Sequence, residues 1–344
     1  MTDQRLAPEA IPAALEPILH QQIPGTAGGS IANWRKSESG FASDTYLFDV
    51  VGADRSAGEH FVFRRPPDPL LFPDYDLRRQ YLTMQRLAGT GVQVPTLQWI
   101  DVADNPLGGQ YYVMDRIEGG SSPSDLPAYH TAGVYFDADE AGREKYWHGC
   151  IDTIAQIHRL DWRSLRLDFL RYPQYGTEPV EQAVGYLTVA ARWAAPTVPE
   201  GIARGLAWLS DNLYTPDHIT LCWGDSRLSN LLYDNDISVI GVLDWECAYL
   251  GDHEADLAWL LFTDWLSSEF QGNQRLAGTP SRAAVIARYE QQSGMTVHRL
   301  KFNEILAAVL LAVPLIRMSA HLKIEGMPDL SIMCSTRIDQ LLAE

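Results

Sequence analysis

Hydrophobic and polar residues alternate with two different periods in the first 115 positions. In residues 8–22 the apolar residues recur at helical spacing, which predicts a leading helix. Beyond it, short runs rich in aromatic and β-branched residues are bounded by turn-forming residues, as in strands. The predicted strands are 31–36 (IANWRK), 44–51 (DTYLFDVV), 60–65 (HFVFRR), 96–102 and 110–115. A helix predicted at 75–87 interrupts them, so we expect a small antiparallel sheet with one inserted helix.

From about residue 141 onward the helical period dominates. The extended, glycine-terminated segment DRIEGG separates this part from the first. Helices are predicted at 143–160, 180–193, 201–213, 254–265, 281–292 and 299–322, with a short one at the end of the chain. A hairpin with its turn at 234–236 interrupts them. The pattern predicts an α+β molecule: a β-rich lobe over 1–115, a hinge at 116–120 and a mainly helical lobe over 121–344.

Composition and charge narrow the classes of partner. The chain has 344 residues, of which 46% are hydrophobic and 21% charged, as in ordinary globular proteins. Its net charge is −17, and no basic face can be recognised, so we expect no nucleic-acid partner. The negative charge could steer cationic substrates, or it could simply keep the protein in solution.

The four cysteines and the apolar runs predict a cytoplasmic location. Cys150, Cys222, Cys247 and Cys334 show neither a zinc spacing nor the density of a disulfide scaffold, so a reducing compartment is expected. The first residues do not have the pattern of a signal peptide. The apolar run 305–316 is shorter than the roughly 20 residues that cross a bilayer, so no membrane contact is expected.

Candidate chemistry is concentrated in residues 221–260. Asp225 and Asn230 lie five residues apart in one predicted loop, and Asp244 follows after the hairpin. Carboxylates and amides among apolar residues are costly unless they are paired or hold a metal. This arrangement favours a magnesium–nucleotide site. The small, hydroxyl-rich connection 37–43 could place backbone N–H groups over phosphates, although an ordinary hairpin would have the same composition.

Six segments in unchanged order carry a resemblance to a known family. They are FVFRRPPDPLLFPDYD, YLTMQRLAGTGVQVP, YYVMDRIEGG, IAQIHRLDW, WGDSRLSNLLYD and VIGVLDWECAYLGDHEADLAWL. Between about residues 28 and 266 the chain resembles the aminoglycoside phosphotransferase (APH) family. Within it, the chain is most similar to the branch found as the kinase-like domain of acyl-CoA dehydrogenase fusion proteins. The resemblance implies a protein kinase-like two-lobe fold, with a small antiparallel β lobe and a larger helical lobe.

The resemblance implies roles for the polar residues of 221–260. Asp225 matches the catalytic aspartate, which accepts the proton of the acceptor hydroxyl and orients it. Asn230 and Asp244 match the two magnesium ligands and offer the hard oxygen donors that this ion prefers. Asp256 matches a structural aspartate that braces the catalytic loop. His158, on an apolar helix face, is interpreted as a core histidine.

The nucleotide is expected to contact the β-rich lobe. Arg64 aligns with the lysine of the third strand that binds the α- and β-phosphates, and Arg65 is the alternative. In the loop over the phosphates, the candidates are Ser37, Gly40 and Ser43. Met114 falls at the back of the adenine pocket, and the backbones of Asp115 and Ile117 would bind the purine.

Two positions depart from the family pattern. Gln80 stands where the family has a glutamate that pairs with the strand-three cation, which leaves Arg64 to find another acid, for which Asp76 is one candidate. Trp223 replaces the histidine before Gly-Asp, which we interpret as a change in packing. Glu246 could support the metal site from behind or brace the loop.

Together these features predict a Mg²⁺-dependent O-phosphotransferase that uses ATP (or GTP). The acceptor would be a hydroxyl of a small metabolite, a hydroxyacyl compound or an aminoglycoside-like molecule, and the protein a monomer or homodimer. A nucleotide-binding pseudokinase without phosphotransfer is the alternative, motivated by Gln80 and Trp223. A protein kinase is disfavoured, because the connection after Asp244 is too short for an activation segment.

Overall fold

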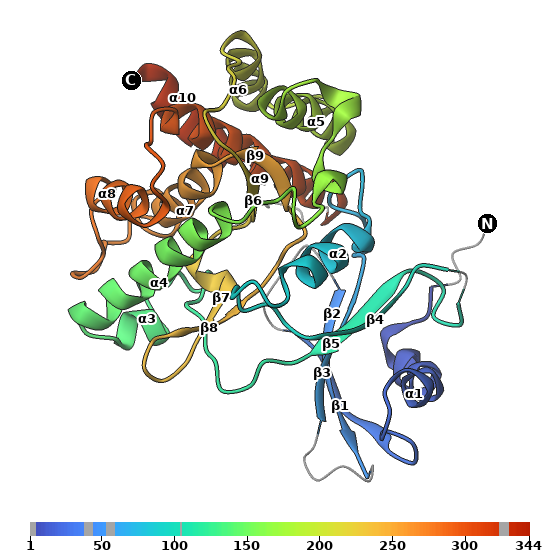
Figure 1. Ribbon diagram of the computed structural model, residues 1–344. Helices are drawn as coiled ribbons and strands as arrows, with labels where there is room; N and C mark the ends of the chain where they lie inside the picture. Colours follow the sequence, from blue (N-terminus) through green and yellow to red (C-terminus); the bar gives the residue numbers. More distant parts are fainter. Residues whose placement is uncertain (1–4, 38–43, 53–58, 104, 323–329) are drawn as a thin grey trace. The chain divides into compact units, whose positions relative to one another are not determined.

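The structure is a computed structural model that describes residues 5–37, 44–52, 59–103, 105–322 and 330–344 (Figure 1). Its internal contacts divide the chain into two compact units. The first unit comprises Met1–Leu70, Asp74–Gln85 and Val94–Glu118, and the second comprises Leu71–Pro73, Arg86–Gln93 and Gly119–Glu344. The first unit thus ends inside the predicted hinge.

The first unit contains a five-stranded sheet in which every neighbouring pair is antiparallel. Its order is β1-β2-β3-β5-β4. The strands are β1 (Ser30–Lys36), β2 (Asp44–Val51), β3 (Glu59–Arg65), β4 (Leu97–Asp101) and β5 (Tyr111–Asp115). Each lies where the alternating pattern predicted a strand, and the antiparallel arrangement is confirmed.

The two faces of this sheet have different roles because successive side chains point in opposite directions. One face carries Phe61 and Phe63, which form a buried cluster with Leu15 and Leu19 of helix α1 (Ile11–Gln22). The leading helix therefore covers the aromatic face of the sheet (Figure 1).

The opposite face carries Arg64. Across the ladder Arg64 pairs with Tyr112, and Val62 pairs with Met114, so Arg64, Tyr112 and Met114 share this face. Helix α2 (Leu77–Leu87) meets it through Tyr81, whose ring contacts that of Tyr112 edge to face, with 5.9 Å between centroids.

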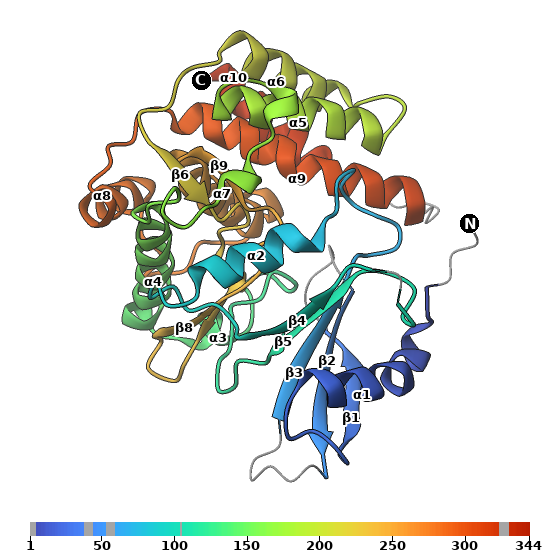
Figure 2. The ribbon, with the colours of Figure 1, turned by 45° about the vertical axis from the view of Figure 1, so that its right-hand side comes forward.

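The second unit is mainly helical. A long apolar helix, α9, packs against α5, α6, α7 and α10 (Figure 2). The helices are α3 (Val134–Asp137), α4 (Glu140–His158), α5 (Pro179–Ala194), α6 (Glu200–Asp211), α7 (Glu254–Ser267), α8 (Arg282–Ser293), α9 (Leu300–Leu322) and α10 (Ile332–Ala343).

Helix α9 is longer and more continuously apolar than the run 305–316 suggested. Among the described helices, it alone is long and apolar enough over Leu300–His321 to cross a membrane. Of that window, 61% is buried inside the protein, and core helices of soluble proteins meet the same criterion. The expectation of no membrane contact stays a prediction.

Two small antiparallel pairs hold the candidate loop. Strand β6 (Ile219–Cys222) pairs with β9 (Tyr249–Asp252), and β7 (Leu231–Tyr233) pairs with β8 (Val239–Val242). The predicted turn joins β7 to β8. Periodicity did not predict β6 and β9, because each has only four residues. Their pairing brings the start and the end of the 223–248 segment together.

Candidate functional site

The candidate catalytic loop starts at a glycine that no other residue could replace without strain. Gly224 follows β6 with φ +88°, a left-handed conformation that L-residues avoid. A Cβ atom at this position would lie 2.1 Å from the backbone oxygen of Cys247. The glycine therefore allows the two backbone segments to approach each other beside Asp225.

Asp256 fixes the backbone of this loop from helix α7. Its Oδ2 accepts a hydrogen bond from the backbone N–H of Trp223 (2.7 Å), and its Oδ1 accepts one from Gly224 (2.8 Å). Nε2 of His158 lies 3.0 Å from Asp256 Oδ2, and Nδ1 lies 2.7 Å from the hydroxyl of Tyr289. These bonds agree with a bracing role for Asp256 and a core role for His158.

Asp225 is nearly buried, with 8% of its surface exposed, and both carboxylate oxygens are engaged. Oδ2 accepts a hydrogen bond from Nδ2 of Asn230 (2.7 Å), and Oδ1 accepts one from the indole N–H of Trp259 (2.8 Å). These two donors, from the loop and from α7, fix the orientation of the carboxylate.

Arg227 adds a positive charge beside Asp225. Its Nε lies 2.9 Å from Asp225 Oδ1, an ion pair that is not aligned as a hydrogen bond. Its Nη1 donates a hydrogen bond of 2.5 Å to Oδ2 of Asp125, which also accepts one from the hydroxyl of Ser229. One guanidinium thus bridges two acids that are a hundred residues apart in the chain.

Burial and charge act in opposite directions on Asp225. Burial raises the pKa of Asp225, and the nearby negative charge of Asp244 raises it further. Arg227 and the hydrogen bond from Asn230 lower the pKa, but the net shift is upward. The carboxylate is therefore more basic than an ordinary aspartate.

Asn230 and Asp244 carry the kind of oxygen donor that a divalent cation prefers. The hydrogen bonds of the Asn230 side chain within the described residues use Nδ2, which also donates to the backbone oxygen of Asp225 (2.9 Å). Its Oδ1 is therefore available as a ligand. Asp244 is half-buried, and its negative charge acts on Asp225. Its carboxylate and the amide oxygen of Asn230 would be the two protein ligands of the cation.

Trp223 fixes the backbone at Asp244. Its indole N–H lies 2.8 Å from the oxygen of Leu243 and 3.1 Å from that of Asp244. Asp244 itself has φ +58°, an unusual conformation for a residue with a side chain. The ring of Trp223 packs on that of Trp245, with 5.9 Å between centroids. The tryptophan thus has a hydrogen-bonding role besides packing.

In the first unit, the two candidate arginines have separate surroundings. Arg65 lies on the face covered by α1, where its Nη1 donates to the oxygen of Leu6 (2.8 Å) and its Nε lies 3.3 Å from Asp44. Arg64 is 7% exposed and lies on the opposite face with Met114. The arrangement agrees with the choice of Arg64 over Arg65.

The family's glutamate position is occupied by a residue with a different partner. Gln80 is buried, and its Oε1 accepts a hydrogen bond from the hydroxyl of Tyr112 (2.8 Å). Asp76 forms an exposed ion pair with Arg78 at 2.7 Å. The expectation that Asp76 could pair with Arg64 was wrong, because the short loop before α2 turns Asp76 toward Arg78.

The other nucleotide candidates are found in or beside the sheet. Met114 is 7% exposed, and the backbone N–H of Asp115 donates to the oxygen of Thr96 (2.8 Å). Ile117 follows in the extended segment and is half-buried. The backbone N–H of Ser37 donates to the oxygen of Thr45 (2.9 Å). Gly40 and Ser43 lie outside the described residues.

Sequence reasoning missed three side chains around Asp225. Trp259 follows Asp256 by three residues on a predicted helix, and this spacing places both side chains on one face of α7, toward the loop. Arg227 is the cation two residues after the proposed base. No signal in the sequence pointed to Asp125.

The sequence is similar to one protein family and to several individual proteins. The sequence model of the phosphotransferase enzyme family (APH) matches residues 33–294. Acyl-CoA dehydrogenase family member 11 of Gallus gallus is 30% identical over 236 residues, which are 65% of this chain and 27% of that protein. The human member 11 is 26% identical over 315 residues, 86% of this chain and 37% of that protein. The chain therefore spans well under half the length of these relatives.

Solved structures share the fold. A protein of Ralstonia eutropha JMP134, provisionally named an aminoglycoside phosphotransferase, has a TM-score of 0.71 at 20% identity and covers 96% of this chain and 98% of its own. A choline kinase of Cryptosporidium parvum has a TM-score of 0.61 at 13% identity, with 96% and 94% covered. The ADP-bound aminoglycoside phosphotransferase APH(2'')-Ib has a TM-score of 0.52 at 14% identity, with 96% and 97% covered.

The solved structures confirm the predicted protein kinase-like fold, and the family match confirms the predicted class of enzyme, a phosphotransferase. The sequence relatives also agree with the resemblance to the branch fused to acyl-CoA dehydrogenases. Because the family model covers most of the sequence, the chain belongs to the phosphotransferase enzyme family.

Proposed function

We propose that this protein transfers the γ-phosphoryl group of ATP or GTP to a hydroxyl of a small molecule in a Mg²⁺-dependent reaction. The observation that carries the proposal is the constellation in the second unit. Asp225 is buried and oriented, burial raises its pKa, and Asn230 and Asp244 offer oxygen ligands in the same segment.

In this mechanism Asp225 accepts the proton of the attacking hydroxyl. A raised pKa suits that role, because a base works best when its pKa approaches the working pH. Trp259 and Asn230 hold the carboxylate in one orientation, so that the hydroxyl is aligned for in-line attack. Asn230 and Asp244 would hold the magnesium ion, which neutralises negative charge on the phosphates.

The first unit would bind the nucleotide. Arg64 is the proposed partner of the phosphates, and Met114, Asp115 and Ile117 are the proposed contacts of the base. Arg64 and Met114 share the sheet face that α1 does not cover, which supports their assignment to one ligand. Ser37, with Gly40 and Ser43, is the proposed loop over the phosphates.

The proposed acceptor is a hydroxylated small molecule. Proteins with this fold carry names that include aminoglycoside phosphotransferase and choline kinase, so the fold itself does not select one acceptor. The relatives fused to acyl-CoA dehydrogenases favour a hydroxyacyl compound or another hydroxylated metabolite, and the net charge of −17 would suit a cationic, aminoglycoside-like acceptor. The four free cysteines fit the proposed cytoplasmic location.

Substitution of the base tests the proposal. Asp225→Asn should lower kcat by about 10²–10⁴-fold, because the proton acceptor is lost, while nucleotide binding persists. The measurement is phosphate transfer to a panel of hydroxylated compounds, together with calorimetric titration of the nucleotide. Asp161→Asn, a change of the same kind in an exposed turn of the same unit, is the control. Transfer by Asp225→Asn at nearly the wild-type rate would contradict the assignment.

A nucleotide-binding pseudokinase is the second candidate. It is favoured by Gln80, which carries no charge and is hydrogen-bonded to Tyr112. In that case the wild-type protein would bind the nucleotide but transfer phosphate to none of the hydroxylated compounds.

A further inference from the structure

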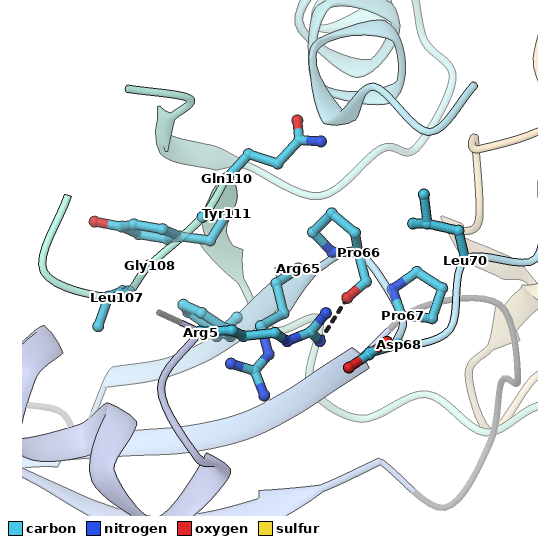
Figure 3. A pocket seen from close by; sticks show the side chains of 12 residues that line it. Arg5, Arg65, Pro66, Pro67, Asp68, Leu70, Leu107, Gly108, Gln110 and Tyr111 are labelled. Atoms are coloured by element: carbon cyan, nitrogen blue, oxygen red, sulfur yellow. Dashed lines mark hydrogen bonds between the residues drawn. The ribbon is translucent and has the colours of Figure 1, made fainter. Parts of the chain in front are cut away.

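The first unit contains a cavity on the sheet face opposite Arg64 and Met114. Its volume is about 370 Å³, at the small end of the range for small-molecule sites. Two arginines reach into it, with Pro66 and Pro67 on one side and Leu107 and Tyr111 on the other (Figure 3). We propose that this cavity binds a small organic monoanion, namely a carboxylate with an apolar body, and that Arg5 and Arg65 recognise its charged group.

The charges around the cavity are unbalanced in favour of cations. One carboxylate, that of Asp44, accepts hydrogen bonds from Arg5 (2.7 Å), Arg65 (3.3 Å) and Lys36 (2.9 Å). Asp68 adds one further negative charge, but its side chain is exposed at the rim. The lining itself, with Arg5, Arg65 and Asp68, therefore carries one net positive charge, in a protein whose net charge is −17. This balance suits a monoanion better than a doubly charged group.

The two guanidinium groups also have hydrogen-bond donors to spare. Arginine has five N–H groups. Arg5 donates through Nη2 to Asp44 and to the oxygen of Pro66, and Arg65 donates through Nε and Nη1. In the part of the chain that the structure describes, Nε and Nη1 of Arg5 and Nη2 of Arg65 have no protein acceptor. Their planar forks match a carboxylate, which can accept two parallel hydrogen bonds.

Apart from Asp68 and Gln110, the other side chains of the lining are apolar, and they favour a ligand with an apolar part. Phe63 and Tyr111 are fully buried rings stacked at 5.2 Å, and Leu107 lies beside them. A hydrated ion such as inorganic phosphate would bury no apolar surface against these rings. A carboxylate with an aromatic ring or a short alkyl chain would bury its apolar part there.

The cavity is distinct from the proposed nucleotide contacts. Arg65 and Arg64 are neighbours in β3, so their side chains leave the sheet on opposite faces. One bound molecule therefore cannot contact both side chains from the same face. The inference does not depend on phosphotransfer, and it can be tested without an acceptor.

Calorimetric titration of the full chain with benzoate and hexanoate tests the proposal, with the neutral benzamide and hexanamide as matched ligands. At least one carboxylate should bind saturably, and its amide should not. Arg5→Gln should weaken that binding about ten-fold, the loss expected for one charge-assisted contact. Arg78→Gln removes the same charge from an exposed position of the same unit, and it should bind the carboxylate as the wild type does.

A second variant tests the cavity without touching its charges. A Cβ atom at Gly109, which lines the cavity, would meet nothing within 4 Å, so Gly109→Leu should fill the space and block binding. Asp225→Asn should leave carboxylate binding unchanged, which separates this inference from the proposed function. The proposal is overturned if neither carboxylate binds saturably, if the amides bind equally, or if both cavity variants bind as the wild type does.

Discussion

At the scale of single residues, the indole of Trp223 supports the backbone that presents a proposed metal ligand. Its N–H faces the oxygens of Leu243 and Asp244, and Asp244 has a left-handed φ. A ring without an N–H would leave both oxygens without this donor. The tryptophan is therefore expected to affect the metal site more than the nucleotide site.

Replacement of Trp223 separates the effect of its N–H hydrogen bonds from the effect of its ring packing. Trp223→Phe should weaken the apparent affinity for Mg²⁺ by about five- to ten-fold, since one buried hydrogen bond contributes about 1 kcal/mol. Trp223→His keeps a ring N–H and should retain more of the affinity. The measurement is the Mg²⁺ dependence of transfer at saturating nucleotide. Equal Mg²⁺ dependence in both variants would show that the ring N–H does not contribute to the affinity for Mg²⁺.

The charge of Arg227 should be visible in the pH dependence of transfer. Asp225 must be ionised to act as base, and its pKa is raised mainly by burial, so activity should fall on the acid side at a pH above the ordinary range of aspartate. Arg227 lowers this pKa, so Arg227→Gln should move the acid limb of kcat/KM to higher pH. A limb that does not move would mean that Arg227 does not act on the base.

The raised pKa of Asp225 also determines how its contribution to folding stability changes with pH. Because the pKa of Asp225 is higher in the folded state, its contribution to stability is present below its pKa in the unfolded chain. The contribution is lost as the pH rises through the raised value. The ionised base therefore costs stability at neutral pH, as expected of a group kept for catalysis.

At the scale of elements, the pairing of β6 with β9 determines the position of the loop. The pairing places Gly224 against the backbone of Cys247, where a side chain has no room. Asp256 then binds the two N–H groups that follow β6. A four-residue strand and one carboxylate thus hold the start of the candidate loop.

Gly224→Ala should be strongly destabilising. The unfavourable φ and the overlap with Cys247 should together lower the free energy of unfolding by about 2–5 kcal/mol. Gly272→Ala is the matched control, because Gly272 has φ +71° but a Cβ atom added there would meet nothing within 4 Å, and it should cost only about 1–2 kcal/mol. Denaturant unfolding measures both, and similar losses would contradict the close approach at Gly224.

At the scale of the whole molecule, the proposed nucleotide contacts and the proposed magnesium ligands belong to different compact units. Arg64 and Met114 belong to the first unit, and Asp225, Asn230 and Asp244 belong to the second. A nucleotide with magnesium that binds only the folded chain should stabilise it against unfolding.

Thermal unfolding with ATP or GTP and Mg²⁺ measures this effect. A ligand present at 100 times its Kd should add about 2.7 kcal/mol to the free energy of unfolding, and the preferred nucleotide should give the larger shift. Asp244→Asn should lose most of the Mg²⁺-dependent part of the shift and keep the part due to nucleotide alone. No shift with either nucleotide at millimolar concentration would contradict the proposed binding.

The sequence by itself determined the elements and the residues of the candidate loop. Alternation predicted the five strands of the first unit, and helical spacing predicted the longer helices, because both periods depend on which side of an element is buried. Asp225, Asn230 and Asp244 lie within twenty positions of one another, so their spacing could also be recognised in the sequence alone. The short strands β6 and β9 were not predicted, because four residues are too few to show a periodic pattern.

Only the tertiary structure decided which side chains surround these residues. It placed Trp259 and Arg227 on Asp225, joined Asp125 to Arg227, turned Asp76 toward Arg78 and brought Arg5 and Arg65 into one cavity. Most of these contacts join residues that are tens of positions apart in the chain. Their formation depends on how elements pack, and a pattern along the sequence records only that a residue faces the core, not which partner it meets there.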